Sequence, residues 1–451
     1  MGRPSHARRL HAWMNGELVG AWVIPTRGEP EFVYEASWFA SPAFRSLSLS
    51  LPAIATHPLI RGERVNAYFD NLLPDSAPIR KRLQTKFRTG SRDAFDLLAA
   101  IGRDCVGAIQ LLPPDEAPSH LTRIEAQPLS DEEVERTLTA TVSTQDAWSA
   151  DDAYDLRISI AGAQEKTALL WHQGKWCRPL GATPTTHILK LPLGLVGHRQ
   201  ADMRTSVENE WLCAQILAAY GIPIAQCEYR TFGQQKCLIV ARFDRKLHST
   251  GRYWLRLPQE DFCQATATPA AIKYESDGGP GMRPICEILT QSDRRLDDLN
   301  TFFKAQVLFW MLRATDGHAK NFSIALLPQD HFHLTPLYDV LSAWPIIGTR
   351  ANQLPPQKIK MAMAWLGKNR HYAATTLKLR HMEETAQKLG IGANARPMVE
   401  ELINATPHAI KRVSEKLPHD FPQDVAEAIF TGLQTSANYL AAKIGTDTRP
   451  A

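Results

Sequence analysis

Apolar and polar residues alternate along the first sixty positions in the manner of short strands. Residues 10–14 and 18–24 are such runs, and Asn15-Gly16 between them favours a tight hairpin turn. Residues 32–34 form a further short run, and residues 46–51 alternate strictly between serine and leucine. The pattern therefore predicts a small sheet, with residues 46–51 as one of its strands.

A helical period replaces this alternation further along the chain. It is present at residues 67–73, 77–87 and 94–101, and later at 207–220, 296–313, 381–389, 397–403, 408–416 and 425–444. Strand-like runs remain at residues 108–112, 167–171, 186–191 and 237–243. We therefore expect an α+β protein of two lobes, strand-rich through about residue 255 and mainly helical after it.

Composition and charge place the chain among ordinary globular proteins. Hydrophobic residues make up 44% and charged residues 22%, and the formal net charge of +4 permits an anionic partner without requiring one. A basic cluster at Arg80, Lys81, Arg82, Lys86 and Arg88 is interpreted as a solvated helix face.

The cysteines and the apolar runs bear on location. Seven cysteines are scattered without a Cys-x-x-Cys pair, a pattern that favours reduced thiols over a disulfide frame or a zinc site. Neither a signal-peptide core nor a run of about 18 apolar residues is present, so we expect a cytoplasmic protein without membrane contact.

The candidate chemistry centres on Asp316-Gly317-His318-Ala319-Lys320-Asn321, which follows a strongly apolar helix. Two strand-like runs, joined by residues 327–330, then lead to Tyr338-Asp339. If the runs pair as a hairpin, Asp316, Asn321 and Asp339 meet at one end of it. A kinase uses such a set: one Asp as catalytic base, and Asn with a second Asp as magnesium ligands. A polar turn that caps a buried helix fits these residues equally well.

Upstream residues fit the remaining parts of a kinase. Residues 157–160 read as a strand and lead into a small-residue loop formed by Ala161, Gly162, Ala163, Gln164, Glu165 and Lys166. Backbone N–H groups of such a loop can lie on phosphates, although a simple hairpin is the other interpretation. Lys190 is a single lysine in an apolar strand, and Glu208 or Glu210 on the next helix is its candidate partner.

Taken together, these segments resemble the HipA family of toxin kinases from bacterial toxin–antitoxin modules. The resemblance runs nearly end to end and is carried by Ser159 and residues 69–76, 101–104, 161–170, 184–192, 242–245, 256–261, 273–281 and 314–323. It implies a two-lobed HipA and protein-kinase-like fold. The expected parts are an N-terminal module at 1–112, a connector at 113–155, a nucleotide-binding part at 156–255 and a helical C-lobe at 256–451.

The resemblance also implies roles for individual residues. Asp316 corresponds to the catalytic base, Asn321 and Asp339 to the magnesium ligands, and Ser159 to an autophosphorylation site that inactivates the enzyme. The expected contacts to ATP come from residues 161–166 and Lys190, from the adenine hinge Ala241, Arg242 and Phe243, and from His318, Lys320, Asn321, Tyr338 and Asp339. Nucleotide is expected between the lobes.

The family further implies a biological role. Its members act as serine/threonine-protein kinases on glutamyl-tRNA synthetase, which inhibits translation and causes growth arrest and persistence. They bind HipB, a helix-turn-helix antitoxin, and join a repressor complex on operator DNA. Gln387 and Gly390 lie where a basic pair contacts DNA in one relative, so DNA contact mainly through the antitoxin is expected.

Two alternatives belong to other functional classes. The chain can act mainly as a binding module, as antitoxin partner and transcriptional co-repressor. It can also phosphorylate a small molecule, because that reaction needs the same nucleotide machinery.

Overall fold

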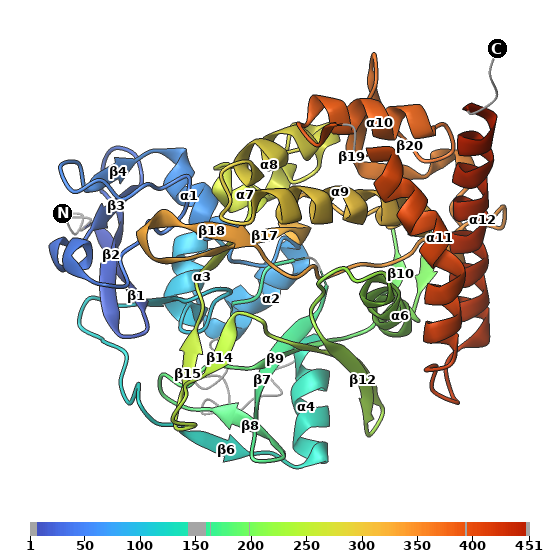
Figure 1. The fold of residues 1–451 in the computed structure, drawn as a ribbon. Helices are drawn as coiled ribbons and strands as arrows, with labels where there is room; N and C mark the ends of the chain where they lie inside the picture. The colour runs from blue at the N-terminus through green and yellow to red at the C-terminus, as the bar shows by residue number, and fades with distance from the viewer. Residues whose placement is uncertain (1–6, 143–158, 163, 198, 393–394, 448–451) are drawn as a thin grey trace. The chain divides into compact units, whose positions relative to one another are not determined.

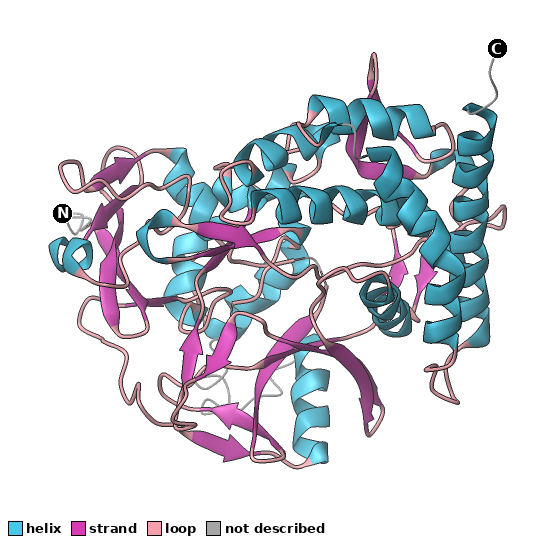
Figure 2. Ribbon diagram, in the orientation of Figure 1, coloured by secondary structure: helices cyan, strands magenta, loops and turns pink. Residues whose placement is uncertain are grey.

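The computed structural model describes residues 7–142, 159–162, 164–197, 199–392 and 395–447. The chain divides into two compact units: unit 1 is Met1–Leu191, Arg230–Lys273 and Ile324–Phe332, and unit 2 is Pro192–Tyr229, Tyr274–Ser323 and His333–Ala451. Unit 1 contains most of the strands and unit 2 the longest helices (Figure 2). The α+β class expected from the sequence is confirmed.

Unit 1 begins with a five-stranded antiparallel sheet of order β4-β3-β2-β1-β5, of which β1 to β4 are labelled in Figure 1. Its strands are β1 (Arg8–Met14), β2 (Glu17–Ile24), β3 (Glu31–Tyr34), β4 (Leu59–Arg61) and β5 (Ile109–Leu112). Asn15 and Gly16 form the expected turn between β1 and β2, both with positive φ (47° and 92°).

Three helices complete this first module: α1 (Glu63–Asp70), α2 (Ala77–Phe87) and α3 (Ala94–Ile101). The bounds of α2 and α3 agree with the sequence prediction. Trp22 of β2 stacks on Phe69 of α1 with ring centroids 4.1 Å apart, and Phe95 of α3 lies 4.9 Å from the same tryptophan. This aromatic contact joins the sheet to its helices.

The strand expected at residues 46–51 is not formed. Ser48 and Leu51 instead close a turn. The carboxylate of Glu260 accepts hydrogen bonds from Ser48 Oγ (2.5 Å) and Leu49 N (2.8 Å), so a side chain and not a strand binds this segment. Leu47 and Leu51 are nonetheless buried, but Ser46 and Ser48 are buried with them, so the alternation of serine and leucine does not separate a buried face from an exposed one. Burial raises the pKa of Glu260 to about 8.

A second sheet of unit 1 has the order β12-β13-β9-β7-β8-β6. Its strands are β6 (Ala126–Pro128), β7 (Lys166–His172), β8 (Lys175–Pro179), β9 (His187–Lys190), β12 (Cys227–Phe232) and β13 (Gln235–Ala241). Helix α4 (Asp131–Val142) packs on β7 and β13, and Ser130 and Glu133 form a reciprocal cap at its start. Part of the segment expected to be a connector therefore belongs to this sheet.

Shorter elements complete unit 1. They are η1 (Ala36–Ala40), β14 (Arg245–Leu247), β15 (Trp254–Arg256), β16 (Gln259–Asp261), α7 (Phe262–Ala265) and η2 (Ala270–Ile272). The expected hairpin is present as β17 (Ser323–Leu326), η5 (Pro328–Asp330) and β18 (Phe332–Leu334), in a sheet of order β16-β17-β18. Leu327 N donates to His331 O at 2.7 Å and closes it.

Five buried charges tie the parts of unit 1 together. Asp104 Oδ1 accepts from Arg245 Nη2 at 2.9 Å and lies 3.1 Å from Arg256 Nη2, while Asp244 pairs with Arg242 at 2.8 Å. The five side chains are at most 8% exposed. Burial alone raises the pKa of Asp104, but the three guanidinium groups outweigh it and hold that pKa far below its usual range.

Unit 2 is built mainly from α6 (Ser206–Ala219), α8 (Met282–Leu289), α9 (Arg295–Leu312), α10 (Leu379–Lys388), α11 (Ala395–Ser414) and α12 (Gln423–Asp447). Its remaining elements are β10 (Gly194–Val196), β11 (Ala201–Met203), η3 (Glu275–Asp277), η4 (Ala319–Asn321), η6 (Trp344–Ile346), η7 (Pro356–Lys358), β19 (Lys360–Leu366) and β20 (Arg370–Ala373). Helix α9 contacts α8, α11 and α12. It is buried on most of its surface, which makes it the centre of the unit.

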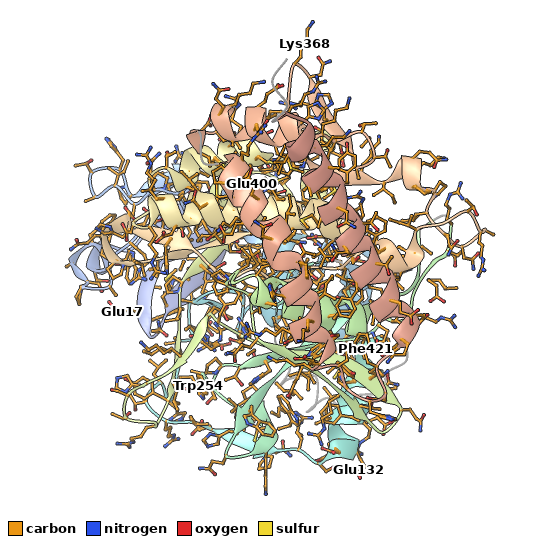
Figure 3. All side chains as sticks on the ribbon, turned by 45° about the vertical axis from the view of Figure 1, so that its right-hand side comes forward. Glu17, Glu132, Trp254, Lys368, Glu400 and Phe421 are labelled. Atoms are coloured by element: carbon orange, nitrogen blue, oxygen red, sulfur yellow. The ribbon has the colours of Figure 1, made fainter. Side chains whose placement is uncertain are left out.

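The loop before α12 is fixed by aromatic contacts. Phe421, labelled in Figure 3, lies 5.7 Å from Trp211 of α6 and 6.4 Å from Tyr229, measured between ring centroids. Among the described residues, no helix combines the length and the apolar character that crossing a bilayer requires.

The two helices expected at residues 397–403 and 408–416 are one helix, α11, with Pro407 inside it. Proline removes one backbone N–H and usually ends a helix. Here Thr406 is fully buried, donates to Leu402 O at 2.9 Å and bonds the Tyr220 hydroxyl at 2.7 Å. These tertiary contacts keep the chain helical across the proline.

We expect Asp104→Asn to lower the free energy of unfolding by about 3–5 kcal/mol, because it leaves three buried guanidinium groups with the Asp244 carboxylate alone. Urea unfolding at neutral pH, followed by tryptophan fluorescence, measures the change. Glu31→Gln is the matched control: it breaks the exposed pair with Arg61, worth about 0–1 kcal/mol. Equal, small losses in both variants would show that the cluster is not important for stability.

Candidate active site

Helix α9 ends at a residue that directs the following chain. Arg313 adopts a left-handed conformation (φ 54°), and its guanidinium lies 4.5 Å from the ring centroid of Trp310 and 4.9 Å from that of Trp344. Burial lowers the pKa of Arg313 to about 10. Ala314 N donates back to Phe309 O at 2.8 Å, which stops the helix and begins the turn to Asp316.

Packing explains the glycine that follows Asp316. A Cβ atom on Gly317 would lie 2.4 Å from a ring carbon of Phe309, which is a buried residue of α9. Only glycine permits the backbone to approach the helix this closely. Packing against Phe309 thus accounts for the glycine in the Asp-Gly-His sequence.

Asp316, Asn321 and Asp339 are brought together at the base of the β17–β18 hairpin. Asn321 Nδ2 donates to Asp316 O at 2.7 Å and to Asp339 O at 3.4 Å. Asp339 has a φ of 63°, a conformation that non-glycine residues rarely adopt and that often occurs at functional sites. The Asn321 amide therefore joins the two aspartate positions through their main chains.

The neighbouring candidates are also fixed. Tyr338 donates its hydroxyl to Lys320 O at 2.9 Å and shares a 2.5 Å hydrogen bond with Ser323 Oγ, so it braces the start of β17. His318 is buried, and its Nε2 lies 3.7 Å from Asp316 Oδ1. Lys320 is 6% exposed.

Sequence reasoning missed Tyr274. Its hydroxyl donates to Asp316 Oδ1, although the two residues are 42 positions apart. The sequence places Tyr274 at the start of a glycine-rich loop and offers no spacing that links it to Asp316. Only the fold brings the pair together.

In unit 1, Ser159 lies just before the small-residue loop and is anchored by hydrogen bonds. Ser159 is fully buried: Ser159 Oγ donates to Leu72 O at 2.8 Å, and its N–H donates to Asp104 O at 3.1 Å. The strand expected at residues 157–160 is not formed at Ser159 and Ile160. Arg157, Ile158 and Ala163 lie outside the described residues.

The loop turns at Gly162, whose φ is 108°. A Cβ atom there would lie 2.6 Å from Lys166 Nζ, so the ammonium group sits close to the loop backbone. Gly162 also bridges Pro74, and Gly162 O accepts from Asp75 N at 3.1 Å. Ala161 precedes this turn.

The second half of the loop joins the sheet. Gln164 Nε2 donates to Leu191 O at 2.6 Å, and Glu165 pairs with Arg82 of α2. Lys166 of β7 lies directly opposite Lys190 of β9 in the antiparallel register. Side chains directly opposite each other on neighbouring strands lie on the same face of the sheet, so the two lysines are neighbours there.

Among the hinge candidates, Arg242 makes separate contacts with its backbone and its side chain. Arg242 N donates to Thr186 O at 2.9 Å, while its guanidinium is 1% exposed and belongs to the buried ion cluster. Both the N–H and the guanidinium of Arg242 therefore already have protein partners. In unit 2, Glu208 and Glu210 are both buried on α6.

The donor set suits magnesium. Asn321 and Asp339 offer side-chain oxygens, and Mg²⁺ is usually held by one or two such ligands together with substrate phosphates. Within the described part of the chain, no group of three His, Cys, Asp or Glu residues forms a metal site. A site completed by phosphate oxygens needs no such group.

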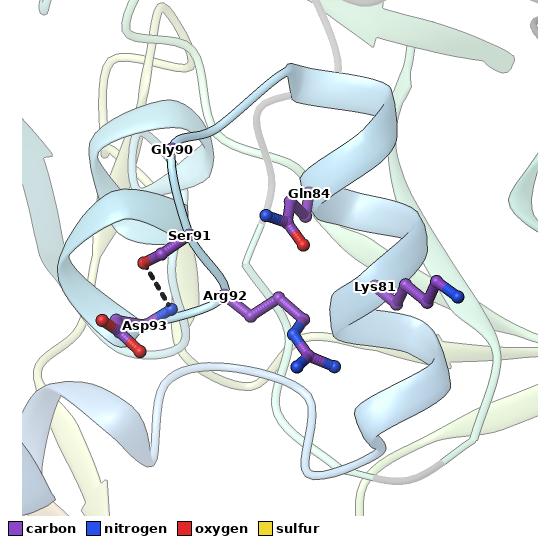
Figure 4. Close-up of a pocket in the computed structure, with 6 residues that line it drawn as sticks. All are labelled: Lys81, Gln84, Gly90, Ser91, Arg92 and Asp93. Atoms are coloured by element: carbon purple, nitrogen blue, oxygen red, sulfur yellow. Dashed lines mark hydrogen bonds between the residues drawn. The ribbon is translucent and has the colours of Figure 1, made fainter.

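An open polar pocket of about 520 Å³ lies elsewhere in unit 1 (Figure 4). It is lined by Lys81, Gln84, Gly90, Ser91, Arg92 and Asp93 and contains none of the predicted site residues. Two of the arginines in the basic cluster of α2 are paired, Arg80 with Asp70 and Arg82 with Glu165. The interpretation of that helix as wholly solvated is therefore only partly right.

The mixed fold, the lysine pair beside a small-residue loop, and the Asp, Asn and Asp set define a protein-kinase-like architecture. Residues 158–410 match the HipA-like C-terminal domain, and residues 10–112 match the HipA N-terminal domain. The chain belongs to the HipA family.

Relatives and a solved structure agree with this assignment. The putative kinase Y4mE of Sinorhizobium fredii is 33% identical over 422 residues, covering 90% of this chain and 92% of the relative. The serine/threonine-protein kinase toxin HipA of Shewanella oneidensis is 27% identical over 292 residues, covering 62% and 63%. A solved complex of Shewanella oneidensis HipA, HipB and operator DNA matches 98% of this chain and 100% of its own chain, with a TM-score of 0.77 at 20% identity, and shows the same fold.

We expect Gly317→Ala to destabilise the protein by about 1–3 kcal/mol, because the added methyl group must displace the buried Phe309 ring. Gly90→Ala is the matched control, since its Cβ would meet its nearest atom at 3.4 Å. Neither glycine has a positive φ, so the comparison isolates packing. A urea midpoint unchanged in Gly317→Ala would contradict the packing argument.

Proposed function

We propose that this chain is an ATP- and magnesium-dependent serine/threonine-protein kinase, the toxin of a type II toxin–antitoxin system. The observation that carries the proposal is the Asn321 amide, which joins the main chains of Asp316 and Asp339. A polar turn that only capped α9 would not need a second aspartate, in a left-handed conformation, on the far side of a hairpin.

In this mechanism Asp316 accepts the proton of a serine hydroxyl. The serine oxygen forms a bond to the γ-phosphorus, the bond from that phosphorus to the bridging oxygen breaks, and ADP leaves. The carboxylate of Asp316 is 54% exposed, so an acceptor chain can reach it. Asn321 and Asp339 would hold magnesium, which neutralises charge on the phosphates.

The nucleotide contacts come from the remaining candidates. Lys166 and Lys190 bind phosphate oxygens, and N–H groups between Ala161 and Lys166 cover them. Ala241, Arg242 and Phe243 contact the adenine through their main chains, while His318, Lys320 and Tyr338 line the site. The register supports this assignment, because it places Lys166 and Lys190 opposite each other on neighbouring strands.

We propose glutamyl-tRNA synthetase as the protein substrate, with inhibited translation, growth arrest and persistence as the consequences. A HipB-like helix-turn-helix antitoxin is the proposed partner, through which the kinase joins operator DNA. Support comes from the Shewanella relative, which is named as a kinase toxin and has been solved with HipB and its operator DNA. A role mainly as antitoxin partner and co-repressor is the second candidate, supported by the same complex.

We expect Asp316→Asn to reduce phosphoryl transfer about 100- to 10,000-fold, the usual contribution of a catalytic base. Transfer from labelled ATP to glutamyl-tRNA synthetase measures this, and urea unfolding verifies that the variant is folded. Asp297→Asn, an exposed position in the first turn of α9, is the control. Full activity in folded Asp316→Asn would contradict the mechanism, and an inactive wild type that binds an antitoxin would favour the second candidate.

We expect autophosphorylation to add one phosphoryl group, at Ser159, and to inactivate the enzyme. Ser159 is fully buried, and a phosphate with nearly two negative charges cannot stay beside the Leu72 and Asp104 carbonyls. Residues 159–166 should then leave their anchors and exchange amide hydrogens faster. Intact mass and peptide mapping of the wild type and Ser159→Ala test this, and a phosphate at another residue would contradict it.

A further inference from the structure

Tyr274 makes two contacts with the candidate catalytic segment. Its hydroxyl donates a hydrogen bond to Asp316 Oδ1. Its ring meets the His318 ring edge-on, with centroids 4.9 Å apart and an interplanar angle of 86°. One side chain thus contacts both ends of the Asp-Gly-His sequence.

The loop that carries Tyr274 is held in place by its own hydrogen bonds. Asp277 N and Gly279 N both donate to Tyr274 O, at 3.0 and 2.9 Å. These bonds close η3 around the tyrosine main chain, and Gly278 completes the turn with a φ of 101°. The backbone of Tyr274 is therefore restrained.

The next residue anchors this loop to β19. Glu275 Oε2 accepts from Ala364 N at 2.6 Å, and its side chain is 7% exposed. A Cβ atom on Gly281 would lie 2.2 Å from the Glu275 carboxyl carbon, so the loop closes tightly over this anchor. The loop that carries Tyr274 is therefore held against β19 by the residue next to the tyrosine.

Asp316 has few other restraints on its side chain. Its carboxylate is 54% exposed, whereas its main chain is held by His318 N and by the Asn321 amide. An exposed carboxylate rotates freely unless one oxygen is held. The tyrosine hydroxyl supplies that hold at Oδ1.

We propose that Tyr274 is a positioning residue for phosphoryl transfer: it holds Oδ1 of Asp316 so that Oδ2 faces the acceptor hydroxyl. This inference rests on the proposed role of Asp316 as catalytic base. Tyr274 contacts neither the γ-phosphorus nor the acceptor oxygen in this role. It acts by keeping the base in one orientation, which reactions of this kind depend on.

The test compares Tyr274→Phe with the wild type. The change removes the hydroxyl and keeps the ring on His318. We expect kcat to fall about 10- to 100-fold, the scale of a misplaced catalytic group. The KM values for ATP and glutamyl-tRNA synthetase should stay within about threefold, because binding does not use the hydroxyl. If the hydroxyl has only a structural role, Tyr274→Phe should lower the free energy of unfolding and should not lower kcat selectively over KM.

Tyr439→Phe is the matched control, since its hydroxyl donates to Leu377 O elsewhere in unit 2. It should leave kcat unchanged. Three results would overturn the proposal: an unchanged kcat in Tyr274→Phe, a lower KM for the protein substrate with a faster rate, or a phosphate on Tyr274. The second would identify Tyr274 as a group that occupies the acceptor position, and the third as an acceptor itself.

A double-mutant cycle separates this inference from the proposed function. If Tyr274 acts through Asp316, Tyr274→Phe has no further effect on transfer in the Asp316→Asn background. If the wild type transfers no phosphoryl group, the proposed function fails. The same cycle in urea midpoints then decides whether the two side chains interact, and additive shifts would overturn the contact itself.

Discussion

Unit 1 depends on a buried cluster of three arginines and two aspartates. Taking five charges out of water is costly, and the cost is offset only when every charge has close partners. The cluster satisfies this condition and also binds main-chain groups: Arg245 donates to Gly107 O and Arg256 to Ala182 O. It therefore fixes the segment leaving the first module against the second sheet. Asp104 is the common point, because its main-chain carbonyl also holds Ser159.

Asp104 belongs to the ion cluster through its side chain and holds Ser159 through its main chain. The Ser159 N–H donates to the main-chain carbonyl of Asp104, whose carboxylate accepts from Arg245 in the ion cluster. At this fully buried position the serine hydroxyl donates to the Leu72 carbonyl. If Ser159 is phosphorylated as proposed, the added charge would disturb these contacts.

In unit 2 the corresponding constraint is the end of α9. The helix is buried on most of its surface, so its position is set by apolar packing and not by the polar residues that follow it. Arg313 stops the helix between two tryptophan rings, and Phe309 leaves room only for glycine at 317. Asp316 is consequently placed by hydrophobic contacts, while its carboxylate is oriented by a tyrosine from a separate loop.

The sequence by itself determined the features that depend on local spacing. Alternation and turn dipeptides predicted the Asn15-Gly16 hairpin, helical periodicity predicted α2, α3 and α9, and the hairpin after residue 322 predicted that Asn321 and Asp339 lie together. Tertiary structure decided the rest. Residues 46–51 alternate like a strand but bond to the Glu260 side chain, Pro407 lies within a helix supported by Tyr220, and Tyr274 reaches Asp316 across 42 residues. The physical reason is the range of the interaction: periodicity records which face of a segment is buried, whereas a hydrogen-bond partner or a neighbouring charge comes from wherever the folded chain brings it.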